Sequence, residues 1–335
     1  MRNRIYHQWS QQFLISNGDQ TYVRTTSSGD ETTVLSEAQS YGMLLTVYAA
    51  QKGQANQENF DSLYRYYKNH RLEGTQLMSW KQVIKNGQET VEKHNATDGD
   101  LYIAYSLIEA AKQWPDKAQE YEGQAKSILI DILRFNYNED TGVLKVGNWA
   151  KKNTDFYYLM RTSDTLPHYF QVFYNLTGDK QWLDIKDEML GQLEQISSQS
   201  ETGLLPDFIW VEKSGARVAD GNTIESQYDG AYSYNACRLP YHLAQSRDER
   251  SQKIVQKMMA FFMKEKRIYA GYDLQGHALN QYQAGSFLAP ITYAANTVEG
   301  NLKLLQQNKY IFTQDLPLDN YYDATMITMI ALELF

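Results

Sequence analysis

The sequence predicts an all-α protein assembled from about six helical hairpins. Apolar residues recur with the spacing of a helix along almost the whole 335-residue chain. A helix, a short link, a second helix and a longer loop repeat about six times, and no single hairpin can bury its apolar face alone. Six hairpins closed in a ring would form an inner and an outer circle of helices, with the long loops gathered at one end.

Several of the expected helices carry their own start and end signals. Ser36 and Asp98 stand at the start of apolar runs, and Asp116 follows Pro115, as residues that begin helices often do. Gly178 follows an apolar run, as a glycine at a helix end often does. We expect helices at residues 3–14, 36–51, 58–69, 98–113, 116–134, 163–177, 180–199, 229–245, 250–264, 286–296, 298–307 and 321–335.

The long segments between these helices are expected to be functional loops. They hold much of the Gly, Asp, Asn and Trp, and long loops in a compact domain usually serve a function. Short strands are expected in the last two of them, for example at residues 208–211. No Pro/Ser-rich linker interrupts the chain, so residues 1–335 are interpreted as a single domain. The loops lie at residues 17–35, 70–97, 136–162, 200–228 and 266–285.

Composition restricts the class of protein. With 42% apolar and 21% charged residues, the chain can bury a sizeable core and is not expected to carry long disordered tails. The formal net charge of -8 disfavours nucleic acids and anionic membrane surfaces, since both attract clustered Lys and Arg. No long apolar run occurs, so no transmembrane segment is expected. Cys237 is the only cysteine, so no intrachain disulfide can form.

The aromatic residues are skewed towards tyrosine. The chain has 26 Tyr, 12 Phe and 6 Trp. A tyrosine offers a flat apolar face and a hydroxyl, which suits the apolar faces and polar rims of sugar rings. Packing between helices can explain any single Tyr. The large number of tyrosines in the chain is what favours a carbohydrate ligand.

Two expected helix starts carry acidic side chains. Glu37 opens an apolar helix, and a helix N-terminus favours the ionised carboxylate. A general acid needs the opposite, a pKa raised by burial or by a neighbouring carboxylate. Asp98 and Asp100 flank a glycine at another helix start, where they suit either capping or a grip on sugar hydroxyls.

A third segment, residues 227–240, gathers three Tyr with Asp229 and Arg238. The Arg238 guanidinium has the fork geometry that binds a carboxylate through two hydrogen bonds. Other catalytic patterns are missing from the sequence: HExxH, paired CxxC, a phosphate-binding Gly loop and G-x-S-x-G. The six His are scattered without metal-ligand spacing, so we expect no metal and no cofactor.

Together the three segments resemble glycoside hydrolase family 8, which includes endoglucanases, xylanases, chitosanases and biofilm-polysaccharide hydrolases. Its signature S-E-G-Q-G-Y-G-M is similar to S-E-A-Q-S-Y-G-M from Ser36. Its motif A-T-D-x-D-L-x-I-A-Y-x-L-L-E-A matches A-T-D-G-D-L-Y-I-A-Y-S-L-I-E-A from Ala96, and Y-D-A-x-R-x-P matches Y-N-A-C-R-L-P from Tyr234. The resemblance implies an (α/α)6 barrel and an inverting, endo-acting hydrolase. The implied substrate is a β-linked polysaccharide, such as glucan or an exopolysaccharide, and we expect the linkage to be β-1,4.

The resemblance also implies roles for individual residues. Glu37 matches the proton donor, and Asp98 matches the acid that holds the distorted sugar at the cleavage point. Arg238 and several aromatic side chains are expected to contact the substrate. The aromatic candidates are Trp80, Tyr41, Tyr102, Tyr169 and Trp149 or Trp210.

One position departs from the family pattern. In much of the family the general base is the Asp of the third motif, where this chain has Asn235, whose neutral amide cannot take a proton from water. We therefore expect Asp229 to be the base and Asn235 to help position the water, with Glu225 and Glu201 as the other candidates. Inverting hydrolysis requires acid and base carboxyls about 6.5–9.5 Å apart.

Alternatives stay open. The chain could be a glycan-binding relative with impaired catalysis, or Asn235 could be an introduced substitution. A different (α/α)6 enzyme, such as a polysaccharide lyase, would need a Tyr, His or Lys base and a uronic acid substrate. We expect a monomer that binds a poly- or oligosaccharide. The first residues show no apolar signal stretch, so the protein is either cytoplasmic or, as we expect, secreted or on the cell surface with its leader or anchor missing from this sequence.

Overall fold

The structure, a computed structural model, describes residues 2–26 and 29–335, and most of its regular structure is helical. By its internal contacts the chain divides into two compact units. Unit 1 comprises Met1–Tyr137, Gly147–Trp149 and Asp315–Phe335, and unit 2 comprises Asn138–Val146 and Ala150–Gln314. The single domain expected over residues 1–335 stays a prediction.

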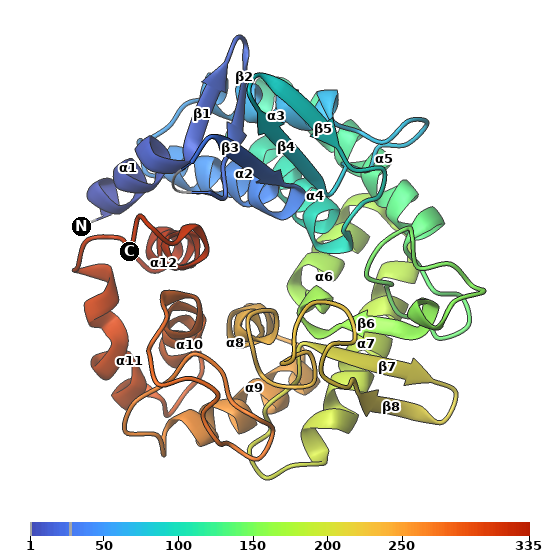
Figure 1. The fold of residues 1–335 in the computed structure, drawn as a ribbon, viewed down its shortest axis with the longest axis vertical. Helices are drawn as coiled ribbons and strands as arrows, with labels where there is room; N and C mark the ends of the chain where they lie inside the picture. The colour runs from blue at the N-terminus through green and yellow to red at the C-terminus, as the bar shows by residue number, and fades with distance from the viewer. Residues whose placement is uncertain (1, 27–28) are drawn as a thin grey trace. The chain divides into compact units, whose positions relative to one another are not determined.

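Unit 1 contains three pairs of contacting helices. Helix α2 packs against α3, α4 packs against α5, and α12 packs against α1. Figure 1 shows α12 beside α1, so the first and the last helix lie together within this unit. Its elements are α1 (Arg2–Phe13), β1 (Leu14–Asn17), β2 (Gln20–Val23), β3 (Glu31–Leu35), α2 (Ser36–Gln51), α3 (Gln57–Asn69), β4 (Lys81–Lys85), β5 (Gln88–Val91), α4 (Thr97–Gln113), a 3-10 turn (Pro115–Lys117), α5 (Ala118–Phe135) and α12 (Tyr321–Leu334).

Side-chain composition explains which of these helices lie inside. Helices α2, α4 and α12 are buried on nearly every side. Helices α3 and α5 bury only one face and keep polar residues on the other. A helix that is apolar all round has to be covered on all sides, and an amphipathic helix can supply that cover. The pairs of unit 1 therefore each combine a buried helix with a more polar one.

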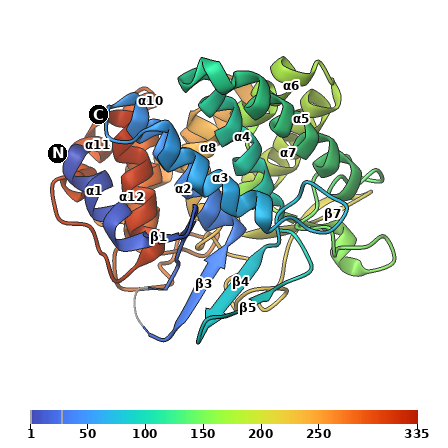
Figure 2. The same ribbon diagram turned by 90° about the horizontal axis from the view of Figure 1, so that it is seen from above.

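A small sheet adjoins the start of helix α2 in unit 1. Strands β3, β4 and β5 pair antiparallel in that order, and Figure 2 shows them side by side. Leu35, the last residue of β3, pairs with Lys81, the first residue of β4. The Ser36 N–H then donates to the Trp80 carbonyl over 2.9 Å. This pairing fixes the start of α2 beside the segment that carries Trp80.

Unit 2 repeats the pairing of helices. Helix α6 packs against α7, α8 against α9, and α10 against α11, while β6, β7 and β8 form an antiparallel sheet. Its elements are a 3-10 turn (Asp155–Tyr158), β6 (Leu159–Arg161), a second 3-10 turn (Thr162–Asp164), α6 (Pro167–Thr177), α7 (Gln181–Ser198), β7 (Phe208–Glu212), β8 (Gly215–Val218), a third 3-10 turn (Ala236–Arg238), α8 (Leu239–Ala244), α9 (Glu249–Phe262), α10 (Gly285–Thr297), α11 (Leu302–Asn308) and a fourth 3-10 turn (Lys309–Phe312).

The mainly helical fold and the pairing of twelve helices are confirmed over the residues that the structure describes. The expected helix over 229–245 is wrong, because only Leu239–Ala244 is α-helical and the residues before it form turns around two buried carboxyls. The strand at 208–211 is confirmed as part of β7, and the named strands of unit 1 were missed. Segment 266–285 forms only isolated bridges.

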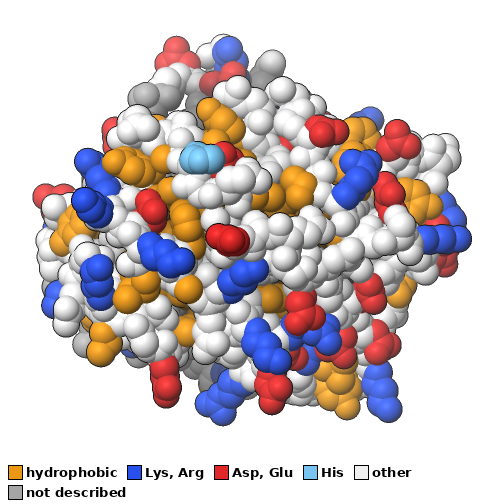
Figure 3. All heavy atoms as spheres, turned by 90° about the horizontal axis from the view of Figure 1, so that it is seen from below, with side chains coloured by type: hydrophobic (Ala, Val, Ile, Leu, Met, Phe, Trp, Pro, Cys, Tyr) orange, Lys and Arg blue, Asp and Glu red, His pale blue; other side chains and the backbone are white. Residues whose placement is uncertain are grey.

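Surface side chains of different kinds are interspersed on the face shown in Figure 3, where basic, acidic and hydrophobic groups alternate. Among the described residues, no helix has both the length and the apolar character needed to cross a membrane. The same residues contain no group of three or more His, Cys, Asp or Glu arranged to hold a metal ion.

Candidate active site

In unit 1, Glu37 and Asp98 lie at the starts of two helices that pack closely together. Glu37 is in the first turn of α2 and half-buried, and Asp98 is in the first turn of α4 and buried. The two helix starts meet at Ser36 and Gly99, where a Cβ on Gly99 would lie 2.3 Å from Ser36 Oγ and 2.9 Å from the Ser36 carbonyl carbon. Glycine at 99 therefore sets how closely these two acid-bearing helix ends approach.

Replacing Gly99 by Ala should lower the free energy of unfolding by about 1–3 kcal/mol, because the methyl group overpacks the contact with Ser36. Hydrolytic activity should fall as well, since the helix starts that carry Glu37 and Asp98 are pushed apart. Gly123→Ala on α5 is the matched control, because a Cβ there meets nothing within 4 Å. Chemical denaturation of both variants measures the effect, and equal stability of the two would contradict it.

Asp100 links the start of α4 to the segment that carries Trp80. Its Oδ1 accepts from the Met78 N–H and its Oδ2 from Asn95 Nδ2, both over 2.8 Å. Complete burial raises the pKa of Asp100 to about 8, against the effect of these two hydrogen bonds. Asn95 continues the network, since its Oδ1 accepts from the Asn148 N–H over 2.7 Å. Asp100 thus fixes Met78, which lies two residues before Trp80. Through Asn95 it also fixes Asn148, which immediately precedes Trp149.

The aromatic candidates of unit 1 differ in exposure. Trp80 is 37% exposed, with Lys81 Nζ 5.6 Å from its ring centre. Trp149 is half-buried against Gly147, where a Cβ would lie 2.7 Å from its Nε1. Tyr41 and Tyr102 are fully buried and pack edge-to-face with ring centres 4.8 Å apart. Burial favours a packing role for these two tyrosines and leaves Trp80 and Trp149 as the rings with exposed surface.

In unit 2, Asn235 lies at the centre of a set of polar contacts. Its Nδ2 donates to Glu225 Oε2 over 2.8 Å, and its Oδ1 accepts from Arg238 Nη2 over 2.9 Å. The same Arg238 nitrogen is 2.9 Å from Ser163 Oγ, and Arg238 is buried. Arg238 therefore orients the Asn235 amide so that its N–H group faces the Glu225 carboxylate.

Glu225 is the accessible carboxylate of this set. Its Oε1 accepts from Arg161 Nη2 over 2.8 Å, and its side chain is 42% exposed. Arg161 is itself held in place at the end of β6, buried with its guanidinium 5.4 Å from the centre of the Phe208 ring. One oxygen of Glu225 is thus fixed by a cation and the other by an amide, while the group still reaches solvent.

Asp229 has a different environment from the one a general base requires. The side chain is 1% exposed, and its oxygens accept the backbone N–H groups of Ile224, Glu225 and Ser226 over 2.7, 3.0 and 2.9 Å. A carboxylate enclosed by three backbone donors has little room for a water to activate. Asp229 instead closes the turn that carries Glu225, which argues against the expected role of Asp229. The other candidate, Glu201, is exposed near the start of the loop between α7 and β7.

Asp207 anchors the turn that contains Asn235. Its Oδ1 accepts from the N–H groups of Ser233, Asn235 and Ala236 over 3.1, 3.1 and 2.7 Å, and its Oδ2 is 3.5 Å from Asn235 Nδ2. Burial raises the pKa of Asp207 to about 7 despite the three backbone donors, and Glu225 adds a smaller effect in the same direction. Three backbone N–H groups thus donate to Oδ1, and the Asn235 side-chain amide donates to Oδ2.

The remaining aromatic candidates lie in different settings. Tyr169 on α6 is fully buried, which favours packing. Trp210 on β7 is half-buried beside Phe156, with the Arg217 guanidinium 5.5 Å from its ring centre. Trp210 therefore keeps a partly accessible ring.

The sequence predicted no role for Arg161 or Asp207, and for Asp100 it left capping or sugar binding open. Asp100 lies inside a motif already noted, and Asp207 lies in the Leu-Pro-Asp-Phe segment immediately before β7. An acid beside a Pro at the start of a strand is a signal that could have marked Asp207. Arg161 has no such local signal, because its partner Glu225 is 64 residues away.

Known proteins resemble this chain over most of its length. A beta-glucanase from Niallia circulans is 33% identical over 332 residues, which cover 95% of this chain and 80% of that protein. Endoglucanase A from Acetivibrio thermocellus is 31% identical, with 87% of this chain and 60% of that protein covered. The chain thus spans less than two thirds of that endoglucanase.

Solved structures also share the fold. The apo structure of a beta-1,3-1,4-glucanase from Paenibacillus sp. X4 superposes with a TM-score of 0.88 at 29% identity, covering 99% of this chain and 89% of that one. A cold-adapted family 8 xylanase gives a TM-score of 0.79 at 16% identity, with 99% and 90% covered, and shows likeness of fold alone. The family model described as Glycosyl hydrolases family 8 matches residues 1–333. The chain therefore belongs to glycosyl hydrolase family 8.

Proposed function

We propose that this family 8 glycoside hydrolase cleaves a β-linked glucan in the interior of the chain, with inversion at the anomeric carbon. The observation that carries the proposal is the solvent-accessible carboxylate of Glu225, held by Arg161 and Asn235. It supplies the base that Asn235 cannot provide. The names of the relatives, beta-glucanase and endoglucanase, support a β-glucan substrate and endo action.

The proposed reaction uses two carboxyl groups. Glu37 donates a proton to the glycosidic oxygen, so that the bond to the anomeric carbon breaks with the electron pair leaving on that oxygen. Glu225 takes a proton from a water, and the water oxygen attacks the opposite face of the sugar. Asp98 holds the sugar at the cleavage point. This assignment replaces Asp229 by Glu225 as the base.

Two side chains act on the proposed base without touching the substrate's reacting atoms. Asn235 donates to Glu225 Oε2 and fixes the direction of the carboxylate. Asp207 holds the backbone on both sides of the Asn235 side chain by accepting three N–H groups. Both are positioning residues, and a carboxylate held in advance avoids the entropic cost of ordering it during the reaction.

The wider organisation is part of the same proposal. Six helix pairs and the family fold support an (α/α)6 barrel, and we propose that it forms one domain and acts as a monomer. A polysaccharide too large to cross a membrane unaided supports a secreted or cell-surface location. Sugar stacking is proposed for Trp80, with Trp149 or Trp210 as a further platform, since these rings keep accessible surface.

Glu37→Gln should reduce the release of reducing ends from soluble mixed-linkage β-glucan by about 10²–10⁴-fold while leaving thermal unfolding unchanged, because the amide cannot protonate the leaving oxygen. For the wild type, proton NMR of the first products should show the α-anomer, as inversion of a β-linkage requires. Normal turnover by Glu37→Gln would remove Glu37 from the role of acid. Binding without reducing-end release by the wild type would support the glycan-binding alternative instead.

A further inference from the structure

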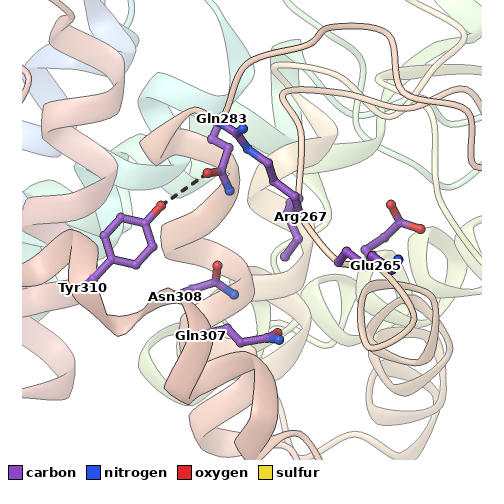
Figure 4. Close-up of a pocket in the computed structure, with 8 residues that line it drawn as sticks. Glu265, Arg267, Gln283, Gln307, Asn308 and Tyr310 are labelled. Atoms are coloured by element: carbon purple, nitrogen blue, oxygen red, sulfur yellow. Dashed lines mark hydrogen bonds between the residues drawn. The ribbon is translucent and has the colours of Figure 1, made fainter.

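A polar cavity lies in unit 2, outside the set of residues around Glu225. It has a volume of about 410 Å³, within the range of small-molecule sites, and is lined by residues from three segments. Figure 4 shows the labelled side chains, which come from the loop after α9, from the segment before α10, and from the end of α11 with the turn that follows it. The lining residues are Glu265, Lys266, Arg267, Ile268, Gln283, Gln307, Asn308 and Tyr310.

The chemistry of the lining matches a neutral sugar. Two amide side chains, Gln283 and Gln307, offer both donors and acceptors, as sugar hydroxyls require. The third amide, Asn308, is buried and its Nδ2 donates to the Leu304 carbonyl over 2.9 Å. Tyr310 adds a ring that is 38% exposed, and its hydroxyl donates to Gln283 Oε1 over 3.5 Å. One acid and two basic side chains also line the cavity, so its charge is mixed instead of strongly basic or acidic.

Further exposed aromatic surface adjoins this segment. Tyr282, the residue before Gln283, is 50% exposed, and its hydroxyl is 3.0 Å from that of Tyr234. Tyr234 packs edge-to-face on Phe287 with ring centres 5.0 Å apart, which fixes the pair. Tyr234 immediately precedes Asn235. Two exposed tyrosines in contact, Tyr234 and Tyr282, therefore connect the residue before Asn235 with the residue before Gln283.

We propose that this cavity, with Tyr310 at its edge, is a second binding site for a β-glucan segment. A ring of the polymer would lie on Tyr310 while its hydroxyls bond to Gln283 and Gln307, and Tyr282 would guide the chain between the cavity and Asn235. The choice of β-glucan as ligand rests on the proposed function. The cavity takes no part in bond cleavage. It should therefore strengthen the binding of long glucan chains and leave the hydrolysis of short oligosaccharides unchanged.

The test is retardation of the protein in native gels that contain soluble mixed-linkage β-glucan, with Glu37→Gln as the background. Tyr310→Ala combined with Gln307→Ala should weaken retardation by about tenfold in apparent Kd, and Tyr310→Phe should keep most of it. In the active protein, the same double change should leave kcat and KM on a cello-oligosaccharide of four units unchanged. Gln306→Ala is the matched control, because Gln306 is exposed on the same helix and does not line the cavity.

Unchanged retardation of the double variant, or an equal loss in Gln306→Ala, overturns the inference. If the double variant melts at a lower temperature than the wild type, Gln307→Lys at this exposed position takes its place, since the longer charged side chain obstructs the cavity. If the wild type does not hydrolyse glucan, but the Tyr310→Ala and Gln307→Ala changes still weaken retardation, the proposed function fails and the second site stands. Hydrolysis with retardation independent of Tyr310 rejects the second site alone.

Discussion

Glu225→Gln should lower kcat on β-glucan by about 10²–10⁴-fold while the protein still folds. The side chain is 42% exposed and its carboxylate is the part that takes the proton, so an amide of the same shape removes the chemistry. The Gln N–H group then meets one of the two donors, Arg161 or Asn235, so a modest fall in melting temperature accompanies the loss of activity. In Glu225→Ala, azide should restore turnover, because the small anion can attack the anomeric carbon without a base. Initial rates with and without azide, read as product release, measure this rescue.

Asp229→Asn separates the two candidate bases. This substitution brings an N–H group towards the backbone donors of Ile224, Glu225 and Ser226, so it should lower stability and reduce activity through the turn. Azide should not rescue it, since Glu225 is still present as the base. Rescue of an Asp229 variant, together with normal activity of Glu225→Gln, would return the role of base to Asp229.

Asp207→Ala should destabilise the protein by several kcal/mol. The substitution leaves the N–H groups of Ser233, Asn235 and Ala236 without their acceptor, and each unsatisfied buried donor costs about 1–3 kcal/mol. Turnover should also fall, because Asn235 no longer holds Glu225 in one direction. Asp207→Asn is the control, since its Oδ1 can still accept all three N–H groups. Denaturant titrations of both variants give the comparison, and equal loss in both would contradict the account.

The same residue makes stability depend on pH. Burial raises the pKa of Asp207 to about 7 in the folded protein from a model value of 3.8, so between these values the native state holds a proton that the unfolded state has lost. Stability is therefore highest below about pH 4 for this group and falls as pH rises towards 7, by at most about 1.4 kcal/mol per pH unit. Asp100, whose pKa is raised to about 8, adds a decline of the same sign. Asp207→Asn should remove its own share of the slope, and an unchanged slope would contradict this assignment.

The helical part of the fold could be predicted because its signal is local. Helices α2 and α4 begin where an acid follows or accompanies a small polar residue and continue as long apolar runs. The sheet β3–β4–β5 could not be predicted in this way, since β3 pairs with a strand about 50 residues later and β5 is fully exposed. The segment before α8 was expected to be helical because its residues favour helix, but Asp207 and Asp229 bind its backbone N–H groups in turns instead.

The candidate site was predictable to a similar extent. Glu37 and Asp98 could be identified from their motifs, because each is fixed by the helix that it begins. The base could not, since both Asp229 and Glu225 lie in the same segment and sequence distance favoured the one nearer to Asn235. What distinguishes them is burial and the direction of each carboxylate, and these depend on Arg161, far away in the sequence.

Residues 224–235 contain the proposed base, the carboxylate that closes its turn and the amide that directs it, and most of the bonds among them are formed within this stretch. This segment could therefore replace the matching segment in relatives that have an Asp at the position of Asn235. Three outside anchors would have to travel with it: an Asp ahead of β7, an Arg at the end of β6, and Arg238, which orients the Asn235 amide. Exchanging this short peptide would change which residue acts as the general base. The helices of the recipient protein would keep their sequence.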